Sequence, residues 1–258
     1  MEKKRIELQT VIQLISNDII KIHGNADNLY IDNIADAENV NETTLDWINS
    51  SKLNKQQIAE VSNAKVLLVD PTIEYSSKLQ NDDKVIIIVE KPKKTLAEII
   101  AKFFIEVKSH FIHPNAVISN EAKIDETAFI DAGCVIGKAL IGKNTVIRAN
   151  VCIYDDVVIG DNCIVQAGAV IGTDGLGCTR EANGTLIKFP HIGGVIIGNN
   201  VEIGANCQIA KGALSDTIIS DGCKLNGMCF IAHNCVLEKN VWITGSTMLS
   251  GSTRVGAN

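Results

Sequence analysis

The sequence has few aromatic residues: Phe, Tyr and Trp together make up 4% of its 258 residues. A core with so few large rings has to be filled by aliphatic side chains, and apolar residues of all kinds account for 46% of the chain. The length accommodates one large domain or two of ordinary size. The composition is therefore that of a globular protein able to bury a core.

The sequence also lacks long apolar runs, basic clusters and an export signal. Its longest apolar runs, such as residues 85–89, are too short to span a bilayer. The formal net charge is −6, and no cluster of lysine and arginine forms a stripe for a nucleic-acid backbone. The N-terminus continues into an amphipathic pattern instead of an apolar signal core. We therefore expect a cytoplasmic protein with no transmembrane segment and no nucleic-acid partner, whose eight cysteines are thiols.

Residues 1–104 are predicted to form a small α/β domain. Residues 6–15 place apolar side chains at approximately helical spacing. Residues 64–69 and 84–89 are short runs rich in β-branched residues, bounded by polar residues or proline, as buried strands are. A helix is predicted over residues 93–104, directly after Pro92.

The remainder of the chain, residues 105–258, is dominated by a repeat of six residues. Ile, Leu or Val recurs at every sixth position within 112–136, 141–171, 197–209 and 219–255. From Ala116 to Thr253, the residue two before each of these positions is Ala, Cys, Val or Thr. One bulky and one small residue in every six fit a triangular coil, in which each hexad forms one flat face. The repeat predicts a left-handed parallel β-helix of about seven coils over residues 105–258.

The repeat also assigns structural positions to most of the cysteines and to several corner residues. The small interior position is occupied by Cys134, Cys163, Cys207, Cys223, Cys229 and Cys235. Free cysteine in such a position behaves as a small hydrophobe, and the absence of a Cys-x-x-Cys pair argues against a zinc site. Asn, Asp or Gly often stands three residues after the bulky position, as at Asn144, Asn162, Asn200, Asn206 and Gly222, where a corner tolerates positive φ.

Two interruptions of the repeat are predicted to be loops beside the solenoid. The period is lost between positions 171 and 197, and more briefly between 209 and 219. Solenoids expel insertions as loops, and such loops often carry binding function. The first loop contains Gly172-Thr-Asp-Gly-Leu-Gly, which does not open a helix after a strand and so is not a phosphate-binding motif. Within it, Asp174 is either a turn residue or an acceptor for a sugar hydroxyl.

His233 is the candidate catalytic residue of the solenoid. It stands two residues after the interior Ile231, at an outward position, and Gly251 lies in the same column one coil away. A neutral imidazole can take a proton from an amine near pH 7, and an exposed backbone N–H can bind the oxyanion that develops in acyl transfer. The same spacing also fits a solvated surface histidine beside a glycine selected for a tight face. Spacing alone leaves both interpretations open.

Two other functions of hexapeptide solenoids fit the sequence poorly. A γ-type carbonic anhydrase holds zinc with three histidines, but His191 and His233 have no third partner at a suitable spacing. An ice-binding solenoid needs a regular array of outward threonines, whereas the outward positions here mix Lys, Asp, Asn, Gly and Glu. Neither function is favoured.

Together these features resemble the bacterial UDP-3-O-acylglucosamine N-acyltransferases of lipid A synthesis. The resemblance rests on the small N-terminal domain, the solenoid and the glycine-rich motif of the first loop. It rests further on three motifs: Lys188-Phe-Pro-His-Ile-Gly, Gly212-Ala-Leu-Ser-Asp-Thr and Ile231-Ala-His-Asn. It covers nearly all of the chain.

The resemblance implies a homotrimer with active sites in the clefts between neighbouring prisms. His233 matches the family's general base, which deprotonates the 2-amino group of a UDP-glucosamine derivative as that amine attacks an acyl thioester on acyl carrier protein. Gly251 matches the amide of the oxyanion hole, and Trp47 matches the ring that holds uracil in the nucleotide-binding N-terminal domain. No resident cofactor or metal is expected. Substrate contacts are also expected from Asp174, Lys188, His191, Lys211 and Asn234.

The chain departs from the family pattern at several positions. Asn226 stands where the family has an aspartate seven residues before the catalytic histidine, so it can orient the ring but supplies no charge for the imidazolium. Leu53 replaces a second uracil-contacting tyrosine, Gly175-Leu-Gly-Cys replaces Gly-Phe-Gly-Tyr, and Lys211 replaces an arginine. The family continues for several coils and a helical segment beyond the position of Asn258. The sequence is therefore either a piece of a longer chain or a shortened relative.

These departures leave three functions open. The first is N-acyl transfer from acyl carrier protein to a UDP-amino sugar. The second is N-acetylation of a nucleotide-linked amino sugar by acetyl-CoA, for surface polysaccharide. The third is a sugar-nucleotide-binding module without catalysis, for which Asn226 is the main argument.

Overall fold

The computed structural model describes residues 5–108 and 110–258, and the chain divides into two compact units, residues 1–107 and 108–258. Each unit has a hydrophobic core of its own. Within the described residues, none of the helices combines the length and the apolar character needed to cross a membrane.

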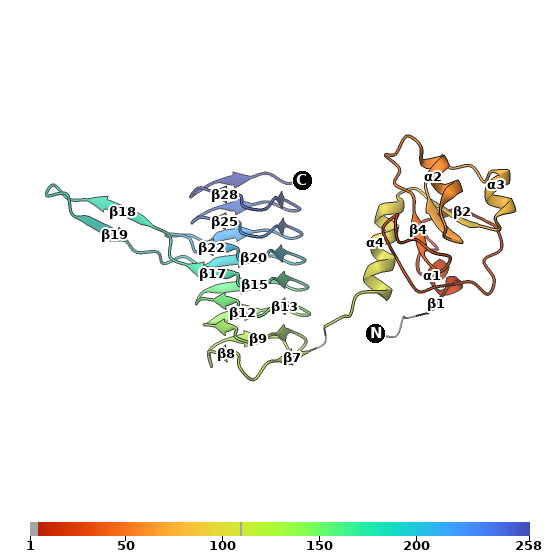
Figure 1. Ribbon diagram of the computed structural model, residues 1–258. Helices are drawn as coiled ribbons and strands as arrows, with labels where there is room; N and C mark the ends of the chain where they lie inside the picture. Colours follow the sequence, from red (N-terminus) through yellow and green to blue (C-terminus); the bar gives the residue numbers. More distant parts are fainter. Residues whose placement is uncertain (1–4, 109) are drawn as a thin grey trace. The chain divides into compact units, whose positions relative to one another are not determined.

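The first unit is built on a four-stranded mixed sheet in the order β2-β6-β5-β4 (Figure 1). β2 (Ile19–His23) runs antiparallel to β6 (Val85–Val89), while β5 (Val66–Val69) is parallel to both β6 and β4 (Leu45–Trp47). A separate antiparallel pair is formed by β1 (Ile6–Glu7) and β3 (Tyr30–Ile31). The helices are α1 (Leu8–Leu14), α2 (Lys55–Val61), α3 (Ser77–Asn81) and α4 (Pro92–Phe103).

Both faces of this sheet are buried, which explains why its central strands are continuous apolar runs. Along β5, Val66 and Leu68 belong to one core, and Leu67 and Val69 belong to the other. Helices α1 and α4 contribute to the first core, and α2 and α3 contribute to the second. Because successive side chains of a strand point to opposite faces, a strand covered on both sides has no polar face.

The predicted segments of this unit are found with one change. Both predicted strands and the helix after Pro92 are present. Residues 6–15, predicted as one helix, instead begin with strand β1, because Ile6 and Glu7 pair with Ile31 and Tyr30 before α1 starts at Leu8.

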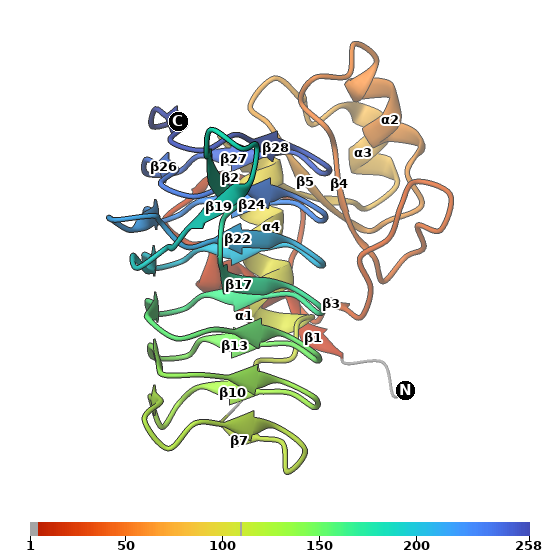
Figure 2. The ribbon, with the colours of Figure 1, turned by 90° about the vertical axis from the view of Figure 1, so that its left-hand side faces the viewer.

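The second unit is a parallel β-helix whose coils are stacked on one another (Figures 1 and 2). Its three faces are parallel seven-stranded sheets. The first sheet contains β7 (Phe111–Ile112), β10 (Phe129–Ile130), β13 (Val146–Ile147), β16 (Ile164–Val165), β21 (Glu202–Ile203), β24 (Lys224–Leu225) and β27 (Trp242–Ile243). The second contains β8 (Val117–Ile118), β11 (Val135–Ile136), β14 (Cys152–Ile153), β17 (Val170–Thr173), β22 (Gln208–Ala210), β25 (Phe230–Ile231) and β28 (Met248–Leu249). The third contains β9 (Lys123–Ile124), β12 (Ala139–Ile141), β15 (Val157–Ile159), β20 (Val195–Ile197), β23 (Thr217–Ile219), β26 (Val236–Leu237) and β29 (Arg254–Val255).

The interior of the solenoid is filled as the repeat predicts. Bulky positions such as Ile153 and Ile209 are buried, and the six cysteines assigned to the small position are at most 1% exposed. The corner residues Asn144, Asn200 and Gly222 have φ values of 53°, 57° and 75°. The predicted parallel β-helix is therefore confirmed down to the residues that turn its corners.

Both interruptions of the repeat leave the stack of coils as loops. The first forms a hairpin of β18 (Gly177–Arg180) and β19 (Leu186–Phe189), which projects from the solenoid (Figure 1). The second, between β22 and β23, accepts two hydrogen bonds from the segment that follows the hairpin. Ile192 N–H donates to the Ala213 carbonyl at 2.8 Å, and Gly193 N–H donates to the Gly212 carbonyl at 3.1 Å. The two loops are thereby held together beside the solenoid.

Candidate active site

His233 lies where the chain leaves strand β25, directly after the buried Ile231 and Ala232. His233 is half-buried, so its imidazole is partly shielded from solvent without being enclosed. The ring nitrogen Nδ1 lies 3.0 Å from Oδ1 of Asn234. Asn234 turns the corner with φ of 60°, a conformation that asparagine tolerates better than most residues.

The surroundings of Asn234 determine which nitrogen of His233 carries the proton. Its Oδ1 accepts a hydrogen bond from Ala213 N–H at 3.0 Å, and its Nδ2 donates to the Ser215 carbonyl at 2.9 Å. An N–H group can only donate and a carbonyl can only accept, so these contacts assign the two ends of the amide. The oxygen therefore faces His233, and Nδ1 must be the donor. His233 consequently keeps the free lone pair on Nε2, the nitrogen available as a base.

Gly251 lies directly against this basic nitrogen. A Cβ built on Gly251 would lie 2.6 Å from both Nε2 and Cε1 of His233, so only glycine fits beside the ring. The coils are tied here by a hydrogen bond from Ser252 N–H to the His233 carbonyl at 2.9 Å. Among the described residues, the Gly251 N–H donates to no protein acceptor. The structure thus brings the candidate base together with a backbone donor that has no acceptor in the described part of the chain.

A second histidine, His191, contacts the first. The ring centroids of His191 and His233 are 5.2 Å apart, with planes at 73°. Gly175 of the glycine-rich loop closes over both rings: its Cβ, if present, would lie 2.6 Å from Nε2 of His191 and 3.0 Å from Cδ2 of His233. The long loop therefore forms part of the wall around the candidate base.

Asp174, adjacent to Gly175, holds two lysines. One carboxylate oxygen accepts from Lys188 of β19, and the other lies 3.1 Å from Nζ of Lys211. These hydrogen bonds, first that of Lys188 and then that of Lys211, lower the pKa of Asp174 to about 2. Two ammonium groups on one carboxylate leave a net positive charge beside the imidazoles.

Asn226 does not take the place that the resemblance implies within a single chain. It follows β24 of the first sheet, whereas His233 follows β25 of the second sheet. Its Oδ1 accepts from Gly227 N–H at 2.8 Å. Among the described residues, the ring of His233 instead contacts Asn234, for which the resemblance implies a contact with substrate.

Trp47 lies in the first unit, on strand β4. It is half-buried, packs against the core that α1 and α4 cover, and lines an open cavity of about 390 Å³ together with Asn49, Lys52 and Asp46. Burial raises the pKa of Asp46, whose carboxylate accepts from the Ser62 hydroxyl at 2.6 Å. Leu53 is fully exposed and does not line this cavity.

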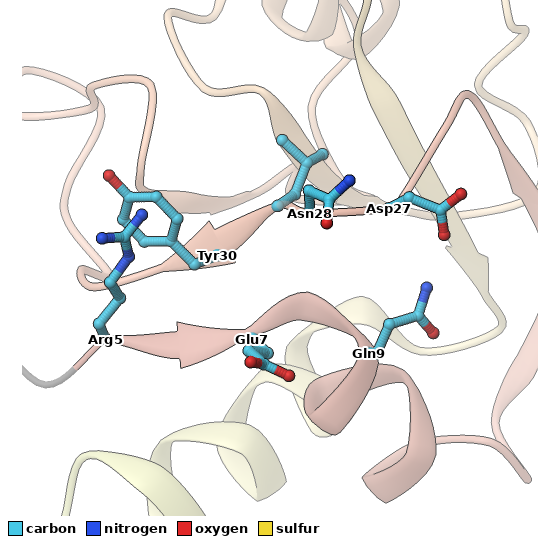
Figure 3. Close-up of a pocket in the computed structure, with 7 residues that line it drawn as sticks. Arg5, Glu7, Gln9, Asp27, Asn28 and Tyr30 are labelled. Atoms are coloured by element: carbon cyan, nitrogen blue, oxygen red, sulfur yellow. The ribbon is translucent and has the colours of Figure 1, made fainter.

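A further cavity of the first unit, of about 650 Å³, lies beside the paired strands β1 and β3 (Figure 3). It is lined by Glu7, Gln9, Asp27 and Asn28, and the guanidinium of Arg5 lies 3.3 Å from the centre of the Tyr30 ring. The described side chains that line it form no nucleophile–base pair, so we assign it no chemistry.

The sequence did not reveal every residue of the site. Ser215 and Gly175 stand in the two insertions, where the six-residue period that located Gly251 gives no neighbours. The quoted loop motifs mark these stretches, but they carry no signal that Ser215 holds Asn234 or that His191 reaches His233. No group of three or more His, Cys, Asp or Glu residues suited to a metal ion is present in residues 5–108 and 110–258.

Comparisons with known proteins agree with the motifs. Residues 138–173 match the family described as bacterial transferase hexapeptide (six repeats). The UDP-3-O-acylglucosamine N-acyltransferase of Dechloromonas aromatica (strain RCB) is 53% identical over 87 residues, which cover 34% of this chain and 25% of that protein. The protein of the same name from Coxiella burnetii (strain Dugway 5J108-111) is 35% identical over 161 residues, which cover 55% of this chain and 47% of that protein. The resemblance stated above is confirmed over these partial lengths.

The solved structures to which this chain is similar include a UDP-N-acetylglucosamine acyltransferase from Francisella novicida. It is 28% identical, with a TM-score of 0.43, and the match covers 57% of this chain and 56% of that one. The acyltransferase of the same name from Campylobacter jejuni is 30% identical, with a TM-score of 0.43 and coverage of 57% and 58%. The chain spans between a quarter and about half the length of the two curated relatives.

Proposed function

We propose that this chain, a relative of the UDP-3-O-acylglucosamine N-acyltransferases over the matched lengths, is an N-acyltransferase of lipid A synthesis. It would move an acyl group from the thioester of acyl carrier protein to the 2-amino group of a UDP-glucosamine derivative. His233 is the general base, and the Gly251 N–H is the oxyanion donor. A homotrimer, with acceptor and donor bound in the clefts between prisms, is part of the proposal.

One observation carries the proposal: the free lone pair of His233 Nε2 lies against Gly251, whose N–H donates to no acceptor among the residues that the structure describes. The tautomer follows from the contacts of Asn234 with Ala213 and Ser215. The close approach follows from the 2.6 Å that a Cβ on Gly251 would leave to Nε2. A surface histidine beside a structural glycine would not need its proton held on Nδ1 by an oriented amide.

The reaction proceeds by addition and elimination at the thioester carbonyl. The amine nitrogen attacks the carbonyl carbon while Nε2 of His233 takes an amine proton. The carbonyl oxygen becomes an oxyanion, which accepts a hydrogen bond from the Gly251 N–H. Collapse of this intermediate breaks the carbon–sulfur bond, and the departing thiolate accepts the proton that the imidazolium took from the amine. The products are an amide and the free carrier thiol.

Asn234 supports both protonation states of the base. Its amide oxygen accepts the Nδ1 proton of His233 before and after Nε2 is protonated. A neutral amide orients the ring but supplies no charge to the imidazolium, unlike a carboxylate in the same place. The nearby net positive charge of the Asp174 cluster suits a phosphate-bearing substrate.

The test is release of free thiol by the purified chain with UDP-amino sugars, with acyl-acyl carrier protein and acetyl-CoA compared as donors. We expect turnover with acyl carrier protein and a loss of roughly 10²–10⁴-fold in kcat for His233→Ala. His113→Ala, at a solenoid position remote from the site, is the matched control and should keep the wild-type rate.

The other outcomes separate the remaining hypotheses. Turnover with acetyl-CoA alone would favour the second hypothesis, N-acetylation of a nucleotide-linked amino sugar for surface polysaccharide. Nucleotide binding without turnover with either donor would identify a binding module and contradict the proposal. Full activity of His233→Ala would be consistent with the proposed reaction but would contradict the role of His233 as its general base.

A further inference from the structure

We propose that His191 is a positioning residue for His233. It holds the imidazole of the base by ring contact, and it stabilises the charged form of that ring through a buried nitrogen lone pair. The inference rests on the proposed role of His233 and adds to it a residue from the hairpin insertion, outside the coil that carries the base.

The first observation is burial with an unpaired polar atom. His191 is 5% exposed, and its Nε2 is buried without a hydrogen-bond partner among the described residues. Its Nδ1 lies 3.0 Å from the Phe189 carbonyl, which can only accept, so Nδ1 carries the proton. Nε2 is therefore a buried acceptor, since a second proton there would be a buried donor with no acceptor. A phenylalanine would fill the space without this unpaired atom, so packing alone does not account for histidine.

The second observation is where this lone pair lies. Nε2 of His191 and Cδ2 of His233 lie within 2.6 Å and 3.0 Å of one point, the position of a Cβ on Gly175. They therefore border the same small space. When His233 accepts a proton, its carbon-bound hydrogens become more positive, and a neighbouring lone pair favours that state. His191 thus supplies part of the compensation that Asn234, as a neutral amide, lacks.

The third observation is that both histidines are anchored to one loop. The residue after His191 donates its N–H to the Ala213 carbonyl at 2.8 Å. Ala213 in turn donates its own N–H to Asn234 at 3.0 Å, and Asn234 faces His233. The hairpin that carries His191 and the amide that holds His233 are therefore fixed relative to each other through Ala213.

A direct contact of His191 with substrate is the competing role. Nε2 is buried near Gly175, and Nδ1 lies 3.0 Å from the Phe189 carbonyl, so within the described residues neither nitrogen is exposed to a ligand. The role that fits is therefore one exerted through His233.

The experiment combines kinetics with histidine NMR, because the chain has only five histidines. His191→Phe keeps an aromatic ring and removes the lone pair, whereas His191→Gln returns an amide oxygen as acceptor. His113→Phe is the matched change at a solenoid histidine outside the site. We expect His191→Phe to lower kcat by about 10- to 10²-fold with both KM values unchanged, and His191→Gln to recover part of the loss. The ¹⁵N signals of the wild type should show both His191 and His233 protonated on Nδ1.

The outcomes are distinct from those of the proposed function. A rise in the KM of the amino sugar with kcat unchanged would overturn positioning in favour of substrate contact. Wild-type kcat in His191→Phe, or a His191 protonated on Nε2, would also overturn it. If the wild type proves inactive with every donor, the inference about His191 is tested by the NMR measurement alone. A shift of the His233 ¹⁵N signal in His191→Phe, but not in His113→Phe, would support the inference. An unchanged His233 signal in His191→Phe would contradict it.

Discussion

The amide oxygen of Asn234 lies 3.0 Å from Nδ1 of His233, and this contact leaves Nε2 as the basic nitrogen. The amide is itself oriented by Ala213 and Ser215, which lie in an insertion between coils. The orientation of the His233 ring on the regular solenoid thus depends on a loop that interrupts the repeat.

Removing the Asn234 side chain should allow the wrong tautomer of His233. We expect Asn234→Ala to lower kcat by at least about 10-fold, a part of the roughly 10²–10⁴-fold that a general base contributes. Asn234→Asp should keep more activity, because a carboxylate oxygen still accepts the Nδ1 proton. Steady-state kinetics measure both. Asn200→Ala controls for the backbone, since Asn200 has a similar φ of 57° at a corner away from the site. Equal losses in Asn200→Ala and Asn234→Ala would refute the tautomer argument.

Adding one methyl group at Gly251 should block the base. The Cβ of Gly251→Ala would lie 2.6 Å from Nε2 of His233, so the ring must move or lose access to the amine. We expect kcat to fall by about 10²-fold or more, on the scale of removing an oxyanion donor. Gly256→Ala, whose Cβ would meet nothing within 4 Å, is the control and should behave as wild type. Undiminished turnover in Gly251→Ala would exclude the proposed reaction geometry.

Gly175, which lies in the loop over the two histidines, should also not tolerate substitution by alanine. A Cβ on Gly175 would lie 2.6 Å from Nε2 of His191, whereas a Cβ on Gly177 would be no closer than 3.4 Å to any neighbour. We therefore expect Gly175→Ala to lower kcat and Gly177→Ala to leave it nearly unchanged, as measured by thiol release. A larger loss of kcat in Gly177→Ala than in Gly175→Ala would show that the loop does not contact the imidazoles through Gly175 during turnover.

Titration of Asp174 should report the lysine cluster. Its pKa is lowered from 3.8 to about 2, so the stabilisation from the cluster is complete above about pH 4 and is lost as the pH falls towards 2. Lys188→Met should raise this pKa towards 3.8, as ¹³C NMR of the carboxyl would show. The change in Tm should be small and confined to the higher pH range, because all three side chains are partly exposed. Lys138→Met, which removes an exposed pair with Glu121, should leave the Asp174 titration unchanged.

The repeat predicted the solenoid well because each hexad makes the same contacts as its neighbours. Knowing the period was enough to place Gly251 beside His233 and cysteines such as Cys207 in the interior. The insertions have no period, so nothing in the sequence indicated that His191 would meet His233 across 42 positions. The role of Asn234 was missed for a related reason, because the residues that orient its amide belong to an insertion. In the first unit, pairing of β1 with β3 overrode the local helical pattern of residues 6–15.

The aromatic ring of Trp47 should determine nucleotide binding, if the cavity that it lines receives the uracil. Trp47→Leu keeps apolar packing against the core but removes the ring, and we expect it to weaken UDP binding by about 1–3 kcal/mol, the scale of base stacking on an aromatic side chain. The KM of the acyl donor should not change. Since the chain has two tryptophans, quenching of Trp47 fluorescence by UDP can be followed in a Trp242→Phe background. Tyr30→Leu, at the cavity beside β1 and β3 (Figure 3), is the control. Loss of UDP binding in Tyr30→Leu but not in Trp47→Leu would assign the nucleotide to that second cavity instead.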